Sequence, residues 1–224
     1  MGIVVAIDGP AGSGKGTVTK RVAKELGMTN IDTGAMYRCV ALAAVREGLK
    51  VEDEDKITAL LDTLEIDIKV KDEKDYIYLN GEDVTKEIRE SHVADVVSPI
   101  SVILPVRIKL IELQRKMSEG KNVIMEGRDI GTVVFPNADV KIYLDADVEE
   151  RAKRRFKENQ EKGIKCTYEE VLENVKTRDY RDSHRPHGAL KKADDAILVD
   201  SSNLTIDEVV EKIIEIIKSK LVNI

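Results

Sequence analysis

The sequence predicts an α/β fold in which a parallel sheet is flanked by helices, and three observations carry this prediction. An apolar run at residues 3–7 leads into a glycine-rich loop, and a helix-like segment at residues 17–26 follows it. Apolar runs then alternate with amphipathic segments along most of the chain. Residues 64–86 interrupt this order with an alternating strand and a tight turn. We therefore expect a core domain of residues 1–63 and 87–224, with a small antiparallel insert at residues 64–86.

The loop between the first strand and the first helix has the composition of a phosphate-binding loop. Gly9, Gly14 and Lys15 satisfy the pattern G-x-x-x-x-G-K, and strand and helix flank it in the required order. The glycines let successive backbone N–H groups point at an anion, and the helix N-terminus adds partial positive charge. The loop consists of Gly9, Pro10, Ala11, Gly12, Ser13, Gly14, Lys15, Gly16 and Thr17.

A hydroxyl usually follows the lysine of such a loop and binds magnesium. Here that position is Gly16, and the hydroxyl comes one place later at Thr17. We expect Thr17 to be the protein ligand of the metal, and the sequence leaves open whether it binds directly or through water.

The next elements are a second strand at residues 28–31 and helices at residues 34–47 and 53–64. In the insert, residues 66–70 alternate strictly between apolar and polar, and residues 71–75 form a charged turn. Asn80-Gly81 between two short strands is a strong hairpin signal. The insert is either structural decoration or a flap that closes over a substrate.

Further helices are expected at residues 87–97 and from Pro105 to Gly120, and a central strand at residues 122–125 ends in the sequence EGRD. Because ligands of parallel sheets bind beyond the carboxyl ends of the strands, substrate groups belong there. Strands at residues 140–144 and 197–200 and helices at residues 147–159 and 168–179 follow. A capping box at Thr205 opens the last helix, whose predicted buried residues are Ile206, Val209, Val210, Ile213, Ile214 and Ile217.

Composition excludes several classes of protein. The chain has 224 residues, 42% of them hydrophobic, and a net charge of −6, which argues against disorder and against nonspecific binding to nucleic acid. Cys39 and Cys166 fit neither a metal motif nor a disulfide framework. Neither a signal peptide nor a membrane span is expected, so we predict a cytoplasmic protein without membrane partners. The histidines show no metal-ligand spacing.

Arginines outside the loop form three groups. One is Arg38, and a second is Arg128 beside Asp129, with Arg107 upstream. The third is a dense set made of Arg151, Arg154, Arg155, Arg178, Arg181 and Arg185. Arginine binds phosphate bidentately and stays charged, which suits phosphoryl transfer. The dense set could equally be solvated helix faces paired with acidic residues.

The motifs resemble those of bacterial cytidylate kinases (CMP kinases), members of the P-loop nucleoside monophosphate kinases, over nearly the whole chain. The matching segments are IDGPAGSGKGT at residues 7–17, DTGAMYR at 32–38, EGRDIGTVVFP at 126–136 and RDYRD at 178–182. The resemblance implies transfer of the γ-phosphoryl group of ATP to CMP or dCMP, with Mg²⁺ accompanying the ATP. It also implies a short helical lid at about residues 151–165.

The resemblance implies roles for particular residues. Lys15, Arg128, Arg155 and Arg185 would act on the transferring phosphoryl group. Residues 9–17 with Arg151 and Arg154 would hold ATP, with Arg151 stacked on adenine. The CMP-binding set would be Thr33, Arg38, Ser98, Arg107, Arg128, Asp129, Arg178, Asp182 and Arg185. Of these, Ser98, Arg107 and Asp129 would read cytosine, while Asp182 could contact ribose or simply orient arginines.

Two other functions stay open at this point. The chain could phosphorylate UMP or another monophosphate, although uracil lacks the amino donor that Asp129 would accept. It could also be a P-loop switch that binds nucleotide and signals to a partner, although the sequence offers no clear partner-binding segment. We expect a monomer, because a fold that opens and closes around nucleotides needs no second subunit.

Overall fold

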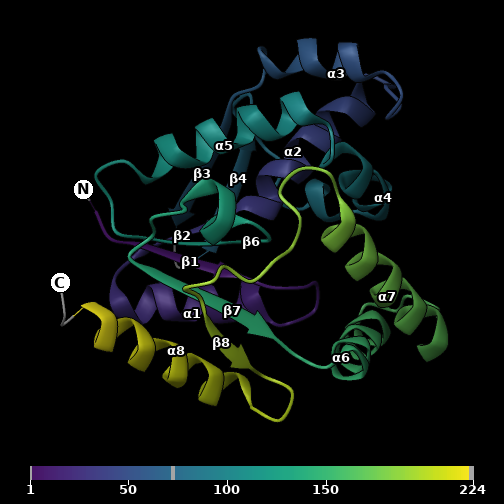
Figure 1. The fold of residues 1–224 in the computed structure, drawn as a ribbon. Coiled ribbons are helices and arrows are strands. Elements are labelled where there is room, and N and C mark those ends of the chain that lie inside the picture. Colours follow the sequence, from purple (N-terminus) through teal and green to yellow (C-terminus); the bar gives the residue numbers. More distant parts are fainter. Residues whose placement is uncertain (1, 72–73, 222–224) are drawn as a thin grey trace. The chain divides into compact units, whose positions relative to one another are not determined.

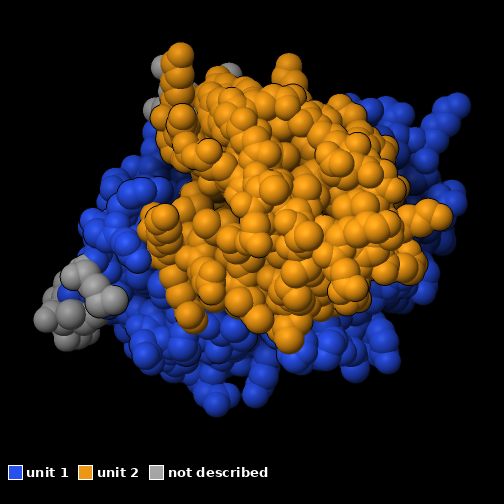
Figure 2. Space-filling view, turned by 90° about the horizontal axis from the view of Figure 1, so that it is seen from above, with its two compact units in different colours: residues 1–30, 118–224 blue, residues 31–117 orange. Residues whose placement is uncertain are grey.

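The computed structural model describes residues 2–71 and 74–221. The chain divides into two compact units, residues 1–30 with 118–224 and residues 31–117, which Figure 2 colours separately. We call them the core unit and the second unit. The elements, labelled in Figure 1, are β1 (Val4–Asp8), α1 (Lys15–Leu26), β2 (Thr29–Asp32), α2 (Thr33–Arg46), α3 (Glu54–Leu61), β3 (Ile66–Lys71), β4 (Lys74–Leu79), β5 (Glu82–Asp83), η1 (Glu87–Arg89), α4 (Ser91–Ile100), α5 (Leu104–Ser118), β6 (Val123–Gly127), η2 (Ile130–Val134), β7 (Val140–Asp145), α6 (Val148–Glu161), α7 (Tyr168–His184), β8 (Ile197–Asp200) and α8 (Ile206–Leu221).

The core unit is built on a parallel sheet with strand order β2-β6-β1-β7-β8. Strand β1 pairs in parallel with both β6 and β7, so Asp8 at its end lies opposite Gly127 on one side and Tyr143 on the other. Helices α1 and α8 pack together with the sheet in one apolar cluster that includes Val22, Ile142 and Ile213. The carboxyl ends of β1, β6 and β7 therefore meet at one edge, which positions the loops that follow them. The parallel sheet flanked by helices and the antiparallel insert are as predicted.

Helices α6 and α7 of the core unit form a separate hairpin with its own small cluster. Ala152, Val171 and Val175 are buried between them, and Phe156 and Tyr168 meet edge to face. Thr167 and Glu170 cap α7 reciprocally, a capping box that the sequence analysis did not identify. The hairpin carries most of the dense arginine set.

The second unit is centred on α2, most of whose residues are buried. Its antiparallel sheet has the order β3-β4-β5, and the predicted turn between β4 and β5 has Asn80 and Gly81 both at positive φ. This combination is typical of a type I′ hairpin turn. The expected turn at residues 71–75 includes residues 72–73, which lie outside the described residues.

Three predicted helices differ from those observed. The helix expected at residues 87–97 is divided at Glu90, which has an extended backbone, into η1 and α4. Ile88 and Val93 are both buried although five residues apart, and one continuous helix would point them about 140° apart. Helix α3 ends at Leu61 rather than residue 64, and α7 continues to His184 rather than ending at residue 179.

The prediction that Ile206 is buried in the last helix is wrong. Ile206 is 48% exposed, whereas the other five residues predicted for this face are buried. Leu204, which precedes the helix, packs against the apolar cluster instead. Among the described residues, none of the helices has the length and apolar character needed to cross a membrane.

Candidate active site

The glycine-rich loop follows β1 and passes close to β7. A side chain at Gly9 could not be accommodated, because its Cβ would lie 2.0 Å from the carbonyl oxygen of Leu144. The Nζ atom of Lys15 donates hydrogen bonds to the carbonyl oxygens of Gly9 and Pro10, both at 2.7 Å, and to Oγ of Ser13 at 3.2 Å. The lysine is thus bound to its own loop, at the N-terminus of α1.

Lys15 lies in a strongly perturbed electrostatic environment. Burial, and after it the repulsion from Arg128, lower the pKa of Lys15 well below its usual value. Attraction from the carboxylates of Glu126 and Asp8 opposes this effect. The four charged side chains therefore lie near one another, where β1 and β6 end.

Arg128, Asp182 and Arg185 form a largely buried group beside the loop. Nε of Arg128 donates to Oδ2 of Asp182 at 2.8 Å, and Nη2 of Arg185 lies 3.8 Å from Oδ1. Burial tends to raise the pKa of Asp182, but the two arginines outweigh this effect and lower it. We call this group the cationic cluster: it holds three cationic side chains and the carboxylate of Asp182 that the two arginines share. Its members are Lys15, Arg128, Asp182 and Arg185. Its members come from the loop, the end of β6 and the end of α7.

Arg178 extends the positive field of this cluster. It lies on α7 and is exposed, yet its charge lowers the pKa values of both Lys15 and Asp182. Asp129 is only 6% exposed and follows Arg128 directly. Four of the predicted site residues, Lys15, Arg128, Asp182 and Arg185, are therefore brought together, and Arg178 lies within reach of their field.

Arg151 on α6 supports the glycine-rich loop through hydrogen bonds. Its Nη1 and Nη2 bind both oxygens of Asp179 on α7 at 3.0 and 2.6 Å, and Nη1 also donates to the carbonyl of Ala11 at 3.1 Å. Nε donates to the carbonyl of Ala146. The side chain of Arg151 is 6% exposed, so in this structure it supports the loop from the protein interior.

The neighbours of Arg151 lie differently. Arg154 donates to Oγ and the carbonyl of Ser201, and Oγ of Ser201 in turn lies 3.4 Å from the carbonyl of Ser13 in the loop. Arg155 is exposed and pairs with Glu158 on its own helix. Arg151 and Arg155 are four residues apart, but one is buried and the other faces solvent.

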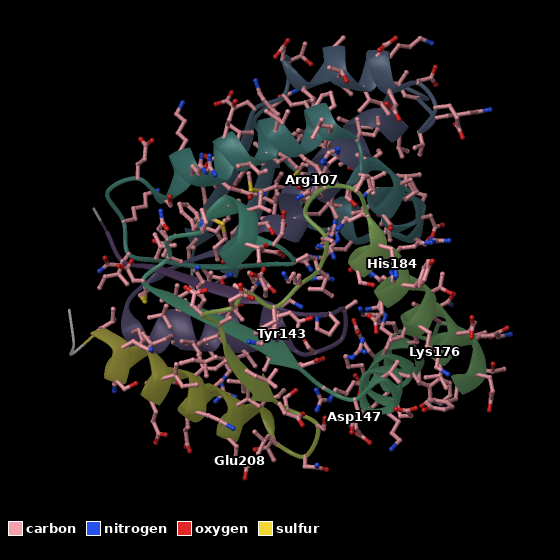
Figure 3. All side chains as sticks on the ribbon, in the orientation of Figure 1. Arg107, Tyr143, Asp147, Lys176, His184 and Glu208 are labelled. Carbon is pink, nitrogen blue, oxygen red and sulfur yellow. The ribbon has the colours of Figure 1, made fainter. Side chains whose placement is uncertain are left out.

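Four further predicted site residues belong to the second unit. Thr33 is buried at the start of α2, where Asp32 caps the helix through the N–H of Ala35. Arg107, labelled in Figure 3, is 2% exposed and donates to the carbonyl of Ser101 at 3.3 Å. The remaining two, Arg38 and Ser98, are both half-buried on α2 and α4.

Two carboxylates that the sequence analysis did not assign lie at this edge of the sheet. Asp8 accepts the backbone N–H groups of Ile130 and Gly131, each at 2.8 Å. Glu126 is 8% exposed, and its Oε1 would lie 3.4 Å from a Cβ at Gly16. Each ends an apolar strand, which is the signal that could have identified them. Tyr143, labelled in Figure 3, adds a phenol whose pKa burial raises to about 12.

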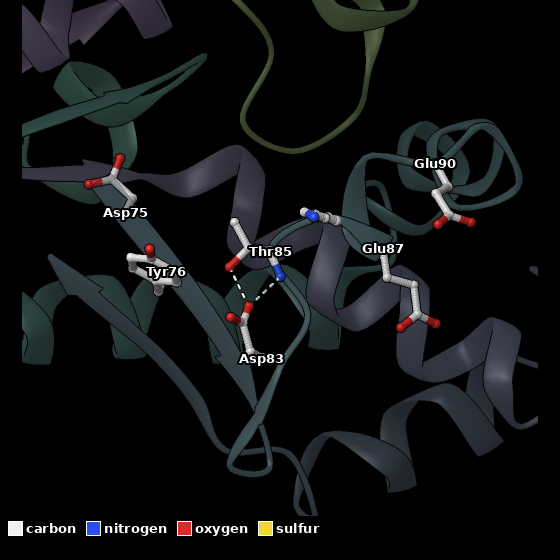
Figure 4. Close-up of a pocket in the computed structure, with 7 residues that line it drawn as sticks. Asp75, Tyr76, Asp83, Thr85, Glu87 and Glu90 are labelled. Atoms are coloured by element: carbon white, nitrogen blue, oxygen red, sulfur yellow. Dashed lines mark hydrogen bonds between the residues drawn. The ribbon is translucent and has the colours of Figure 1, made fainter. Parts of the chain in front are cut away.

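A cavity of about 680 Å³ in the second unit is lined by none of the predicted site residues. Figure 4 shows its rim, where Asp83 accepts from the backbone N–H and the hydroxyl of Thr85. The lining residues are Asp75, Tyr76, Asp83, Thr85, Lys86, Glu87 and Glu90. Four carboxylates against one lysine make this cavity unsuitable for a phosphate. Among residues 2–71 and 74–221, no cluster of three or more His, Cys, Asp or Glu could hold a metal ion.

Comparisons with solved structures support the fold alone. The chain superimposes on an uncharacterised protein from Eubacterium ventriosum with a TM-score of 0.53 and 15% identity, covering 97% of this chain and 99% of that one. The protein TT1252 from Thermus thermophilus gives a TM-score of 0.50 at 17% identity, with 98% of each chain covered.

Comparisons with known sequences identify the family. The family model described as cytidylate kinase matches residues 5–219. The cytidylate kinase of Lactobacillus johnsonii is 51% identical over 98% of this chain and 95% of its own length. The cytidylate kinases of Acholeplasma laidlawii and Caldanaerobacter subterraneus are 50% and 49% identical, covering 97% and 96% of this chain and 96% and 95% of their own lengths. The chain therefore belongs to the cytidylate kinase family.

Proposed function

We propose that this protein transfers the γ-phosphoryl group of ATP to CMP and dCMP, giving ADP with CDP or dCDP. Membership of the cytidylate kinase family supports this function. One structural observation carries it further: the cationic cluster lies beside the phosphate-binding loop, at the edge of the sheet where ligands of parallel sheets bind. A phosphoryl-transfer enzyme needs such a cluster, because it must align two anions and neutralise the group that moves between them.

On the donor side, residues 9–17 hold the phosphates of ATP. The ammonium of Lys15 exchanges its hydrogen bonds to Gly9 and Pro10 for phosphate oxygens, which offer stronger, charge-assisted bonds. Arg154 borders the loop through Ser201. Arg151 supports the loop through the carbonyl of Ala11, and this contact favours a positioning role over stacking on adenine.

On the acceptor side, Arg38, Arg128 and Arg185 bind the phosphate of the monophosphate. The contact between Asp182 and Arg128 supports the reading that Asp182 orients an arginine, and Arg178 with Asp182 borders the ribose. The proposed base readers are Ser98, Arg107 and Asp129, and Thr33 is proposed to contact the same substrate. A carboxylate at Asp129 accepts from the amino group of cytosine, which uracil lacks, and this donor match favours CMP over UMP.

The residues around the loop fit a magnesium ion that enters with ATP. Thr17 and Glu126 offer oxygen ligands, which Mg²⁺ prefers, and the missing side chain of Gly16 leaves space beside the carboxylate of Glu126. We propose that these two residues hold the ion directly or through water. When bound, the ion neutralises charge on the phosphates during transfer.

Arg155 is the proposed mobile cation of the lid at residues 151–165. Its exposed pair with Glu158 is weak, so the guanidinium is available to neutralise the transferring phosphoryl group when the lid closes. The insert at residues 64–86 closes the acceptor side in the same proposal. We expect the protein to be cytoplasmic and monomeric, with nucleotides as its small-molecule partners.

A coupled assay of ADP release tests the function. With ATP and Mg²⁺, CMP and dCMP should turn over rapidly, and UMP, AMP and GMP slowly. Turnover with UMP at the rate of CMP would favour the UMP alternative, and ATP binding without turnover of any monophosphate would favour a nucleotide switch. Arg128→Ala should abolish transfer and leave ATP binding mostly intact, whereas the matched control Arg21→Ala removes only the surface pair with Asp207.

Asp129→Ala tests the base assignment. Loss of one buried hydrogen bond to the amino group of cytosine should lower the CMP/UMP ratio of kcat/KM by an amount equivalent to about 1–3 kcal/mol. An unchanged ratio would show that Asp129 does not read the base.

A further inference from the structure

We propose that Asp8 is a positioning residue for phosphoryl transfer, because its carboxylate holds the segment that carries Arg128 and Asp129 at a fixed distance from the phosphate-binding loop. The inference rests on the proposed roles of those two residues. Asp8 is the last residue of β1, and the loop begins at the next residue, Gly9. Any displacement of Asp8 is therefore transmitted directly to the start of the loop.

The contacts of Asp8 cross from one side of the site to the other. Oδ1 accepts the N–H of Ile130 and Oδ2 accepts the N–H of Gly131, both at 2.8 Å. These are the first two N–H groups of η2, a five-residue π-helix that starts directly after Asp129. One carboxylate 122 residues away in sequence thus caps the helix that follows Arg128 and Asp129.

Hydrogen bonds inside the segment and the side chain of Lys141 stabilise the rest of η2. The carbonyl of Asp129 accepts the N–H groups of Val133 and Val134, and Phe135 donates to the carbonyl of Ile130. Lys141 of β7 packs behind the helix, and its Nζ binds the carbonyl of Pro136 and the carboxylate of Asp195. Asp8 therefore holds the end of η2 nearest Arg128.

Gly131 shows how closely the parts fit. A Cβ there would lie 3.2 Å from Cδ of Lys141 and 3.4 Å from Oδ2 of Asp8. The distance to Lys141 is tighter than ordinary van der Waals contact and the distance to Asp8 is at its limit, so a methyl group would require Lys141 or η2 to shift. Gly131 therefore leaves little room for a side chain between Lys141 and Asp8.

Asp8 occupies a position where an ionised carboxylate is costly unless it is hydrogen-bonded. The residue is 5% exposed, and an ionised carboxylate at such a site loses most of its hydration. Asp129 adds repulsion and Lys15 attraction, and the charge of Asp8 in turn helps to raise the pKa of Tyr143. Two N–H donors match an ionised carboxylate, because both oxygens must accept. An asparagine would accept with one atom and oppose the second N–H with its own donor.

The closing experiment compares Asp8→Asn with Asp139→Asn. Asp139 also accepts a backbone N–H of β1, from Val4 at 2.7 Å, but at the opposite end of the strand. Because small misplacements of reacting groups are costly, we expect kcat with ATP and CMP to fall about 10- to 100-fold in Asp8→Asn. KM for ATP should stay within about threefold, because the loop remains able to bind phosphates. Asp139→Asn should leave both constants unchanged.

NMR of the protein without nucleotide provides a readout independent of activity. In Asp8→Asn, the amide protons of Ile130 and Gly131 should shift upfield and exchange faster with solvent, since at least one loses a charge-assisted hydrogen bond. If Asp8→Asn fails to fold, Gly131→Ala tests the contact between Asp8 and η2 from the side of η2. In this variant, too, kcat should fall by a larger factor than the affinity for ATP.

Two results would overturn the inference. One is an Asp8→Asn variant whose melting temperature changes while kcat at a permissive temperature does not. The other is an equal loss of kcat in Asp139→Asn. Arg128→Ala run in parallel separates the two proposals: if it still phosphorylates CMP, the acceptor-site assignment has failed, whereas loss of activity there with a fully active Asp8→Asn refutes only the role of Asp8.

Discussion

The two charged regions of this molecule, one in the core unit and one in the second unit, use ion pairs in opposite ways. In the core unit, the pair of Arg128 with Asp182 leaves only 21% and 11% of the two side chains exposed. In the second unit, Arg46 of α2 binds Glu82 and Glu87, whose side chains are 58% and 35% exposed. Burial makes the first pair expensive to break, while solvent and salt weaken the second. The more deeply buried pair belongs to the proposed active site, whereas the exposed pairs join α2 to β5 and η1.

The largest effect should come from removing the charge of Lys15. Lys15→Met deletes a buried cation that we propose binds phosphate, and we expect kcat to fall about 10²–10³-fold. Single-turnover transfer to CMP measures the loss. Lys153→Met is the matched control, because this exposed lysine pairs with Glu150 on the surface of α6. Equal losses in both variants would remove the contrast between buried and exposed charge.

Asp182→Ala should come next, through stability as well as activity. It leaves Arg128 and Arg185 without their shared carboxylate, and breaking a buried pair from one side costs about 3–5 kcal/mol. The lowered pKa of Asp182 also fixes the sign of the pH effect: the stabilisation is present at neutral pH and is lost as pH falls below its unfolded value of 3.8. Urea denaturation at pH 7 and pH 3 measures both, and a difference between variant and wild type that is the same at both pH values would contradict this account.

A smaller effect is expected from titrating Asp8. Burial, the largest influence on this carboxyl, raises its pKa to about 6. Because the folded pKa exceeds the unfolded value of 3.8, its contribution to stability is greatest at low pH and is lost as pH rises through 6. The amide protons of Ile130 and Gly131 should titrate with a midpoint near pH 6 in the wild type and not in Asp8→Asn. A midpoint near 4 would show that Asp8 is better solvated than its 5% exposure indicates.

The smallest effect should follow from Arg46→Ala. Arg46 makes four hydrogen bonds to Glu82 and Glu87, yet both partners are accessible to water. Thermal denaturation should show a smaller loss than for Asp182→Ala, and the loss should shrink further at 1 M salt, where the Debye length is about 3 Å. A loss that persists in high salt would show that the two regions differ less than their exposure suggests.

Features that depend on residues close together in the sequence could be predicted, and features that depend on distant residues could not. Local signals identified the strand, loop and helix around Lys15, the turn at Asn80-Gly81 and the capping box at Thr205, because each depends on residues a few positions apart. The partners of Asp8 and Arg151 were not predictable in this way. Their contacts join Asp8 to Ile130 and Arg151 to Ala11 and Asp179, and only the packing of distant elements brings such residues together.

The same limit explains the errors. Ile206 has the right spacing for the buried face of α8, but periodicity does not reveal that Leu204 fills the space at the start of that helix. The division of the helix at Glu90 reflects the need to bury both Ile88 and Val93, which is a demand of the core rather than of the local sequence. Likewise, nothing in the alternation of residues 130–134 distinguishes the π-helix η2 from a loop.

The hydrogen bonds that Lys15 makes to its own loop must be broken before an anion can bind its ammonium group, which disfavours weakly binding anions. Any anion that recruits the ammonium must replace two carbonyl oxygens at 2.7 Å and the hydroxyl of Ser13. Chloride or acetate, with one charge and few acceptors, gains little from this exchange. A triphosphate replaces every contact and adds several negative charges. If Lys15 binds phosphate as proposed, the loop carbonyls compete with anions for its ammonium group, and this competition favours highly charged phosphates.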